Sequence, residues 1–342
     1  GAGVMGHGIA QVSAVAGFEV IVRDIAQEFL DKAMRNVERG LKRLVDRGRM
    51  AEDAAQAALG RISMTLDLSE AVSEADLVVE AVPESLDLKR RVWREVSERA
   101  REDAVLATNT SSLSITSIAE AVSKPERFVG MHFFNPPAVM RLVEVIPGAR
   151  TSRETVELVE ALAERMGKRP VAVKRDAPGF IVNRVLITYL NEAAKLLESR
   201  DWTKEQIDSA MQHRAGMPLG PFMLADLIGL DIVYNILKVF EENLGSEYRP
   251  ARPIETLFQG GKLGRKRGEG FYTYEERPRV PEEGGEGFDV NLLLRPLIDE
   301  AVKVVEEGIA DRGAVDTAMK LGANLPRGPF EMAGDVLRRP GG

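Results

Sequence analysis

Apolar and polar residues in the first half of the chain follow the pattern of short buried strands separated by amphipathic helices. Helical spacing of the apolar positions predicts helices over residues 26–47, 51–58, 87–101 and 115–122. Short, mostly apolar runs predict strands over residues 18–24, 61–65, 77–82, 105–108, 127–132 and 142–146. Strands that alternate with helices are typical of α/β folds, in which ligands bind at the carboxyl ends of the strands.

From Pro178 onward the pattern changes to helical spacing alone. Helices are predicted over residues 180–199, 204–212 and 231–243, with no convincing strand among them. Residues 275–290 are rich in Pro, Gly and charge, which predicts a linker or a mobile loop. We therefore expect an α/β domain at residues 1–176, followed by an all-α part.

A repeat within the helical part relates two segments at a constant shift along the chain. Asp208-Ser209-Ala210-Met211 recurs as Asp316-Thr317-Ala318-Met319, and Gly220-Pro221-Phe222 recurs as Gly328-Pro329-Phe330. An ungapped match of this length indicates two copies of one helical unit that pack together. The expected bounds are residues 177–274 for the first copy, 275–290 for the linker and 291–342 for a second, shorter copy.

The chain opens on a glycine-rich motif, Gly1-Ala2-Gly3-Val4-Met5-Gly6, with the spacing G-x-G-x-x-G. A predicted helix follows, and then a predicted strand that ends in Asp24, which is the layout of a dinucleotide-binding unit. The helix N-terminus would face the pyrophosphate, and the acid would accept hydrogen bonds from the ribose. We expect the first strand of this unit to precede Gly1, outside the sequence. Asp24 favours NAD, while Arg23 beside it leaves NADP as the weaker alternative.

Composition narrows the choice of partners. The chain has 342 residues, a net charge of −7 and a pI near 5.4, so it is long enough for two domains and unsuited to broad nucleic-acid binding. It has no Cys and only three His, so we expect no metal site. No apolar run is long enough to cross a bilayer, and we expect no membrane partner and a cytoplasmic location.

Candidate chemistry lies between Asn109 and Glu144. His132 ends one predicted strand and Glu144 lies inside the next, so a turn at residues 135–137 would place the carboxylate against the imidazole. A carboxylate on one ring nitrogen fixes the tautomer and leaves the other nitrogen to accept a proton. The alternative is a buried histidine with a chance acidic neighbour. The hydroxyl-rich segment that follows residues 105–108 favours a catalytic pair.

Three segments resemble the L-3-hydroxyacyl-CoA dehydrogenase family: NTSSLSITSIA, MHFFNPPAVMRLVEVIPG and DAPGFIVNR. The resemblance runs through nearly the whole chain. It implies a Rossmann domain followed by a helical domain of the 6-phosphogluconate-dehydrogenase C-terminal type, here duplicated. It also implies the NAD-dependent oxidation of L-3-hydroxyacyl-CoA to 3-ketoacyl-CoA, and either a homodimer through the helical domain or a monomer whose second copy fills that surface.

The same resemblance implies roles for individual residues. His132 corresponds to the catalytic base and Glu144 to the carboxylate that orients it, while Ser111 and Asn183 correspond to residues that contact the substrate. The positions expected around NAD are Gly1, Gly3, Val4, Met5, Gly6, Asp24, Glu84, Lys89, Asn109, Ser111 and Asn135.

The binding of the CoA part is the least determined. Arg43 and Arg47, in a basic run interleaved with acidic residues, are candidates for its phosphates, and a solvated helix face is an equal alternative. Gly40 stands where some family members have a serine that contacts CoA. Two other functions stay open: a related NAD-dependent sugar-acid 3-dehydrogenase of the L-gulonate type, and a non-catalytic, crystallin-like use of the scaffold.

Overall fold

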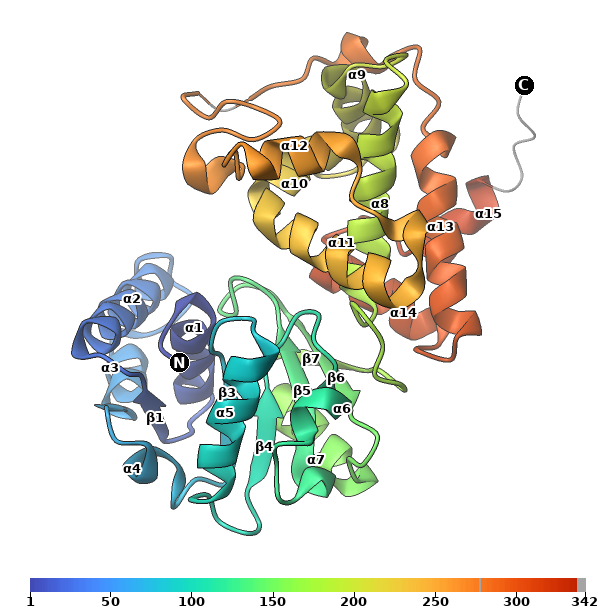
Figure 1. The fold of residues 1–342 in the computed structure, drawn as a ribbon. Helices are drawn as coiled ribbons and strands as arrows, with labels where there is room; N and C mark the ends of the chain where they lie inside the picture. Colours follow the sequence, from blue (N-terminus) through green and yellow to red (C-terminus); the bar gives the residue numbers. More distant parts are fainter. Residues whose placement is uncertain (277, 337–342) are drawn as a thin grey trace. The chain divides into compact units, whose positions relative to one another are not determined.

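The computed structural model describes residues 1–276 and 278–336 (Figure 1). The chain divides into two compact units, Gly1–Asp176 and Ala177–Gly342. The first unit combines strands and helices and the second is helical, which confirms the expected fold class. Arg277 in the predicted linker and residues 337–342 of the predicted second copy lie outside the described residues. Among the described residues, no helix has the length and apolar character needed to cross a membrane.

Two sheets form the first unit. Strands β1 (Val20–Arg23) and β2 (Ile62–Thr65) pair in parallel. The second sheet has five strands in the order β3-β4-β5-β6-β7. These strands are β3 (Leu77–Glu80), β4 (Val105–Thr108), β5 (Phe128–Phe133), β6 (Leu142–Pro147) and β7 (Arg169–Ala172). The β5–β6 pair is antiparallel and the other neighbours are parallel.

The six strands expected from the sequence are all present, and β7 is additional. Its four residues include Arg169 and Pro170, so it lacks the apolar run that marked the others. Proline cannot donate to a ladder, and edge strands such as β7 tolerate it.

Seven helices surround these sheets among the described residues of the first unit: α1 (Val4–Val15), α2 (Gln27–Asp46), α3 (Glu52–Gly60), α4 (Leu68–Val72), α5 (Leu86–Ser97), α6 (Ile115–Ala119) and α7 (Arg153–Arg165). Helix α1 is buried on two sides. Ile9 and Val12 pack into the core that β4, β5 and β6 share, while Ala10 and Ala14 pack against α2 and β1. This double burial fixes the N-terminus of α1, and with it the glycine-rich motif.

The helices of the second unit are α8 (Val182–Glu198), α9 (Lys204–Ser209), α10 (Pro221–Ile228), α11 (Leu230–Leu244), α12 (Arg252–Gln259), α13 (Asn291–Glu306), α14 (Arg312–Gly322) and α15 (Pro329–Val336). A π-helical turn, Ala210–Arg214, extends α9. Helices α13 and α14 of the predicted second copy pack against α8 of the first. At this contact the buried guanidinium of Arg184 pairs with the carboxylates of Glu300 and Glu307. The two copies therefore lie together, as the repeat predicted.

The described part of the predicted linker is irregular but packed. Ser209 donates to the carbonyl of Pro281 at 2.5 Å, and Arg214 donates to the carbonyl of Phe288 at 2.6 Å. Phe288 is buried against the edge of the Trp202 ring. Backbone carbonyls that lack a ladder accept hydrogen bonds here from side chains of the first copy.

Candidate active site

His132 and Glu144 face each other across two antiparallel strands. They are directly opposed in the register of β5 and β6, so both side chains leave the same face of the sheet. The imidazole Nδ1 lies 2.7 Å from Glu144 Oε2, and both side chains are buried. The expected contact between carboxylate and imidazole is present, and the strand register produces it.

Burial gives this pair its chemical character. A carboxylate that accepts from Nδ1–H fixes the tautomer in which Nε2 carries the lone pair. It also stabilises the positive charge that the ring takes up when Nε2 accepts a proton, and a low local dielectric strengthens that effect. The Phe134 ring lies against the imidazole with centroids 4.5 Å apart. The pair can therefore act as an oriented general base.

The glycine-rich motif has the shape that a dinucleotide requires. A Cβ at Gly6 would overlap the carbonyl oxygen of Gly1, so the turn depends on that glycine. A Cβ at Gly3 would meet no atom within 4 Å, and Gly3 lines a pocket of about 730 Å³ together with Val4, Met5 and Asp24. Gly3 thus leaves the N-terminus of α1 open to an approaching phosphate group, and the site fits NAD.

Asp24 follows β1 at the mouth of this pocket. Its carboxylate accepts from the amide of Ala2 at 2.6 Å and from the amide of Ile25 at 2.7 Å. These bonds hold the acid beside the glycine-rich turn. Arg23 is the residue that kept NADP as an alternative cofactor in the sequence analysis. Its Nε donates to the carbonyl of Leu66 at 3.2 Å.

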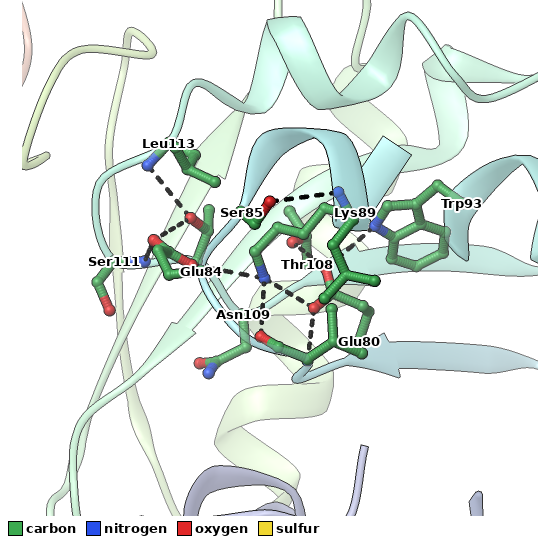
Figure 2. Close-up of polar contacts among 12 residues, drawn as sticks. Glu80, Glu84, Ser85, Lys89, Trp93, Thr108, Asn109, Ser111 and Leu113 are labelled. Carbon is green, nitrogen blue, oxygen red and sulfur yellow. Dashed lines mark hydrogen bonds and ion pairs between the residues drawn. The ribbon is translucent and has the colours of Figure 1, made fainter. Parts of the chain in front are cut away.

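Ser111 lies on a loop that Glu84 organises (Figure 2). Glu84 Oε1 accepts from the hydroxyl of Thr110 at 2.6 Å, from the amide of Ser111 at 2.8 Å and from the amide of Ser112 at 3.1 Å. One carboxylate oxygen therefore ties the backbone of the serine loop, residues 110–112, to the residues that follow β3.

Lys89, which the resemblance places around NAD, is fully buried in this structure. Its side chain is 0% exposed, and Nζ lies 2.7 Å from Glu80 Oε1 and 3.5 Å from Glu84 Oε2. In this structure the ammonium belongs to a buried ionic cluster. The sequence placed Lys89 early in a helix but did not indicate which way the side chain turned.

The remaining expected site residues are spread over both units. Asn109 follows β4, and its Oδ1 accepts from the amide of Phe133 at 2.9 Å, which joins the ends of β4 and β5. Asn135 is exposed on the loop that follows β5. Asn183 lies in the first turn of α8, in the second unit, and is half-buried.

Arg43 and Arg47 are both exposed at the C-terminal end of α2. Gly40, one turn earlier, faces α1 so closely that a Cβ there would overlap Gln11 Oε1. A serine at position 40 would require the end of the Gln11 side chain to move.

Sequence reasoning missed Glu80, whose carboxylate accepts hydrogen bonds from Lys89, Trp93 and Thr108 (Figure 2). The available signal was an acidic residue at the end of an otherwise apolar strand. Within the described ranges, no group of His, Asp and Glu side chains could hold a metal ion.

Comparison with known proteins connects this geometry to a family. The model of the 3-hydroxyacyl-CoA dehydrogenase NAD binding domain matches residues 1–177, and the model of the C-terminal domain matches residues 179–274 and 287–336. A probable 3-hydroxybutyryl-CoA dehydrogenase of Deinococcus radiodurans is 44% identical over 275 residues, which cover 80% of this chain and 98% of the relative. The chain belongs to the 3-hydroxyacyl-CoA dehydrogenase family.

Other relatives match a larger share of this 3-hydroxyacyl-CoA dehydrogenase family member. The fatty acid oxidation complex subunit alpha of Psychrobacter arcticus is 41% identical over 315 residues, which cover 91% of this chain and 43% of the relative. The crystal structure of 3-hydroxybutyryl-CoA dehydrogenase from Escherichia coli covers 98% of this chain and 90% of its own, with a TM-score of 0.92 and 29% identity. The family is one of oxidoreductases, and its NAD binding domain confirms the expected cofactor.

Proposed function

We propose that this protein oxidises an L-3-hydroxyacyl-CoA to the 3-ketoacyl-CoA with NAD. The observation that carries the proposal is the buried pair of His132 and Glu144, held in register by β5 and β6. A test compares the absorbance of NADH during reduction of acetoacetyl-CoA with that during oxidation of L-gulonate by NAD. Turnover of acetoacetyl-CoA alone supports the proposal, whereas turnover of L-gulonate alone favours the sugar-acid alternative, and no turnover of either favours the non-catalytic one.

In the proposed reaction, His132 Nε2 accepts the proton of the 3-hydroxyl group, and Glu144 stabilises the imidazolium that results. The glycine-rich turn and Asp24 would hold NAD, which would supply the acceptor for the hydride from C3. Ser111 and Asn183 donate hydrogen bonds that orient the substrate oxygens. Arg43 and Arg47 attract the CoA phosphates.

The first prediction concerns the base. His132→Gln removes the proton acceptor, so kcat should fall about 10²–10⁴-fold. Glu144→Gln keeps the shape but removes the charge, and kcat should fall heavily as well. The double variant should lose little more than the worse single variant, because residues that act as a unit are not additive. Steady-state kinetics with acetoacetyl-CoA and NADH measures all three.

NADH titration by fluorescence is the control for these variants, since His132 and Glu144 lie on β5 and β6, whereas the glycine-rich turn precedes α1. Affinity should stay close to that of the wild type. Losses that multiply in the double variant, or full turnover in Glu144→Gln, would show that the pair is structural.

The second prediction concerns the cofactor. Asp24→Asn keeps the size of the side chain but removes the charge that accepts from ribose hydroxyls. NAD binding should weaken by roughly 1.5–3 kcal/mol, and the preference over NADP should narrow. Asp53→Asn, at an exposed position in α3, is the matched control. Calorimetric titration of both variants with both cofactors decides this, and equal affinities for wild type and Asp24→Asn would contradict the assignment.

The assembly and location of the protein also belong to this proposal. The packing of α13 and α14 on α8 supports a monomer in which the second copy fills the surface through which the family resemblance implies a homodimer. The homodimer is the alternative. A cytoplasmic location and the absence of nucleic-acid and membrane partners stay predictions.

A further inference from the structure

Glu80 is the centre of a buried cluster at the end of β3. The residue is 4% exposed, and each of its carboxylate oxygens accepts two hydrogen bonds. The four donors are the amide of Val82 at 2.7 Å, Lys89 Nζ at 2.7 Å, Trp93 Nε1 at 3.2 Å and Thr108 Oγ1 at 2.7 Å. They come from β4, α5 and the turn after β3, so Glu80 joins three elements with one side chain (Figure 2).

Lys89 depends on this carboxylate. An ammonium that is 0% exposed needs opposite charge within contact distance, because burial removes its hydration. Glu80 is the nearer counter-ion, and Glu84 is the second, at 3.5 Å. Lys89 therefore stands between a fully buried carboxylate and a partly exposed one.

Glu84 carries the connection onward to the serine loop. Its Oε2 faces Lys89, while its Oε1 accepts from the amides of Ser111 and Ser112 and from the hydroxyl of Thr110. The orientation of the Glu84 carboxylate thus decides where the backbone of residues 110–112 lies. A continuous line of contacts runs from Glu80 through Lys89 and Glu84 to Ser111.

We propose that Glu80 is a positioning residue for the reaction: it holds Lys89, Lys89 holds Glu84, and Glu84 holds the serine loop in place. The proposal rests on the proposed function for the role of Ser111 toward the substrate, but the placement of the loop does not depend on it.

Glu80→Gln tests the first link. The substitution keeps the size of the side chain but leaves the Lys89 charge with Glu84 as its one remaining carboxylate at contact distance among the described residues. Lys89 and Glu84 should draw together, and Glu84 should release the amides of the loop. Hydrogen exchange measured by mass spectrometry on peptides that span residues 109–114 should become at least about 10-fold faster for Ser111 and Ser112. Turnover should fall by about 10-fold or more.

Two further proteins complete the experiment. Glu80→Gln/Lys89→Met removes both buried charges, a change that is often tolerated. The thermal stability of this double variant should therefore be closer to that of the wild type than the stability of Glu80→Gln is. Its serine loop should still exchange rapidly, because Glu84 has lost Lys89. Glu120→Gln is the control, since Glu120 is an exposed carboxylate paired with Arg90, the residue next to Lys89, and its loop exchange and turnover should match the wild type.

The outcomes separate positioning from stability. If stability and loop protection both return in the double variant, or if the loop keeps wild-type protection in folded Glu80→Gln, the proposal is overturned. If the wild type fails to reduce acetoacetyl-CoA, the proposed function fails, while the exchange experiment still decides whether Glu80 positions the loop.

Discussion

In both helical copies of the second unit, an aspartate at the equivalent position caps the N-terminus of a helix. In the first copy, Asp208 accepts from the amides of Phe222 and Met223, at the N-terminus of α10. In the second copy, Asp316 accepts from the amide of Phe330, at the N-terminus of α15. The repeated sequence therefore fixes the repeated cap, in which an acidic side chain satisfies amides that a helix N-terminus leaves open.

A glycine makes this close contact possible in each copy. A Cβ at Gly220 would overlap the Asp208 carboxylate, and a Cβ at Gly328 would overlap that of Asp316. The same crowding at equivalent positions shows that the repeat extends to packing. This shared packing is more direct support for two copies of one helical unit than the sequence match is.

The copies differ in what covers the cap. In the first copy, the segment Gly264–Tyr274 folds back, and the Tyr272 hydroxyl donates to Asp208 at 3.0 Å. Asp226 anchors that segment by accepting from the amides of Phe271 and Tyr272. The equivalent of Asp226 in the second copy is Gly334, which has no carboxylate that could anchor such a segment. Asp208 is consequently fully buried, while Asp316 is half-buried.

Alanine at the two caps should give the largest difference between the copies. Asp208→Ala leaves three buried donors without their acceptor, which should reduce the free energy of unfolding by about 3 kcal/mol. Asp316→Ala should cost about 1 kcal/mol, the usual effect of losing a cap that water can reach. Denaturant unfolding of both variants, with Asp299→Ala at an exposed position of α13 as the control, measures this. Equal losses at the two caps would mean that the covering segment adds nothing to the first.

The architecture was largely predictable because hydrophobic spacing reflects burial. Five of the first six strands are mostly apolar and β2 alternates apolar and polar residues, whereas β7 contains Arg169 and Pro170 and depends on pairing with β6 to be recognised. The repeat was also visible, because the Asp–Gly pair that builds the cap needs those two residue types in each copy.

The candidate site was predictable where its residues lie close along the chain. His132 and Glu144 sit on adjacent strands, so the turn between them indicated their contact. Glu80 and Thr108 meet only because β3 pairs with β4, and no local pattern reveals that pairing. For the same reason, the sequence did not show that Lys89 turns into a buried cluster.

The pH dependence of stability gives a finer test of the two caps. Burial is the main cause that raises the pKa of Asp208 to about 7, while the amide and Tyr272 hydrogen bonds oppose it. Burial also raises the pKa of Asp316, although this side chain is only half-buried. A raised pKa in the folded state favours the protonated carboxyl group. The contribution of Asp208 is therefore fully present below its unfolded pKa of about 4 and is lost as the pH rises to about 7.

Asparagine at each cap isolates this titration, because it keeps one acceptor oxygen and carries no charge. The free energy of unfolding of the wild type, minus that of Asp208→Asn, should fall by about 3 kcal/mol between pH 4 and pH 7. The same difference for Asp316→Asn should fall by less, because water reaches Asp316 and weakens the penalty for its charge. Denaturant unfolding across this range gives both curves. A flat curve for Asp208 would show that its hydrogen bonds offset the cost of burying the charge, and that the covering segment changes the cap by contact alone.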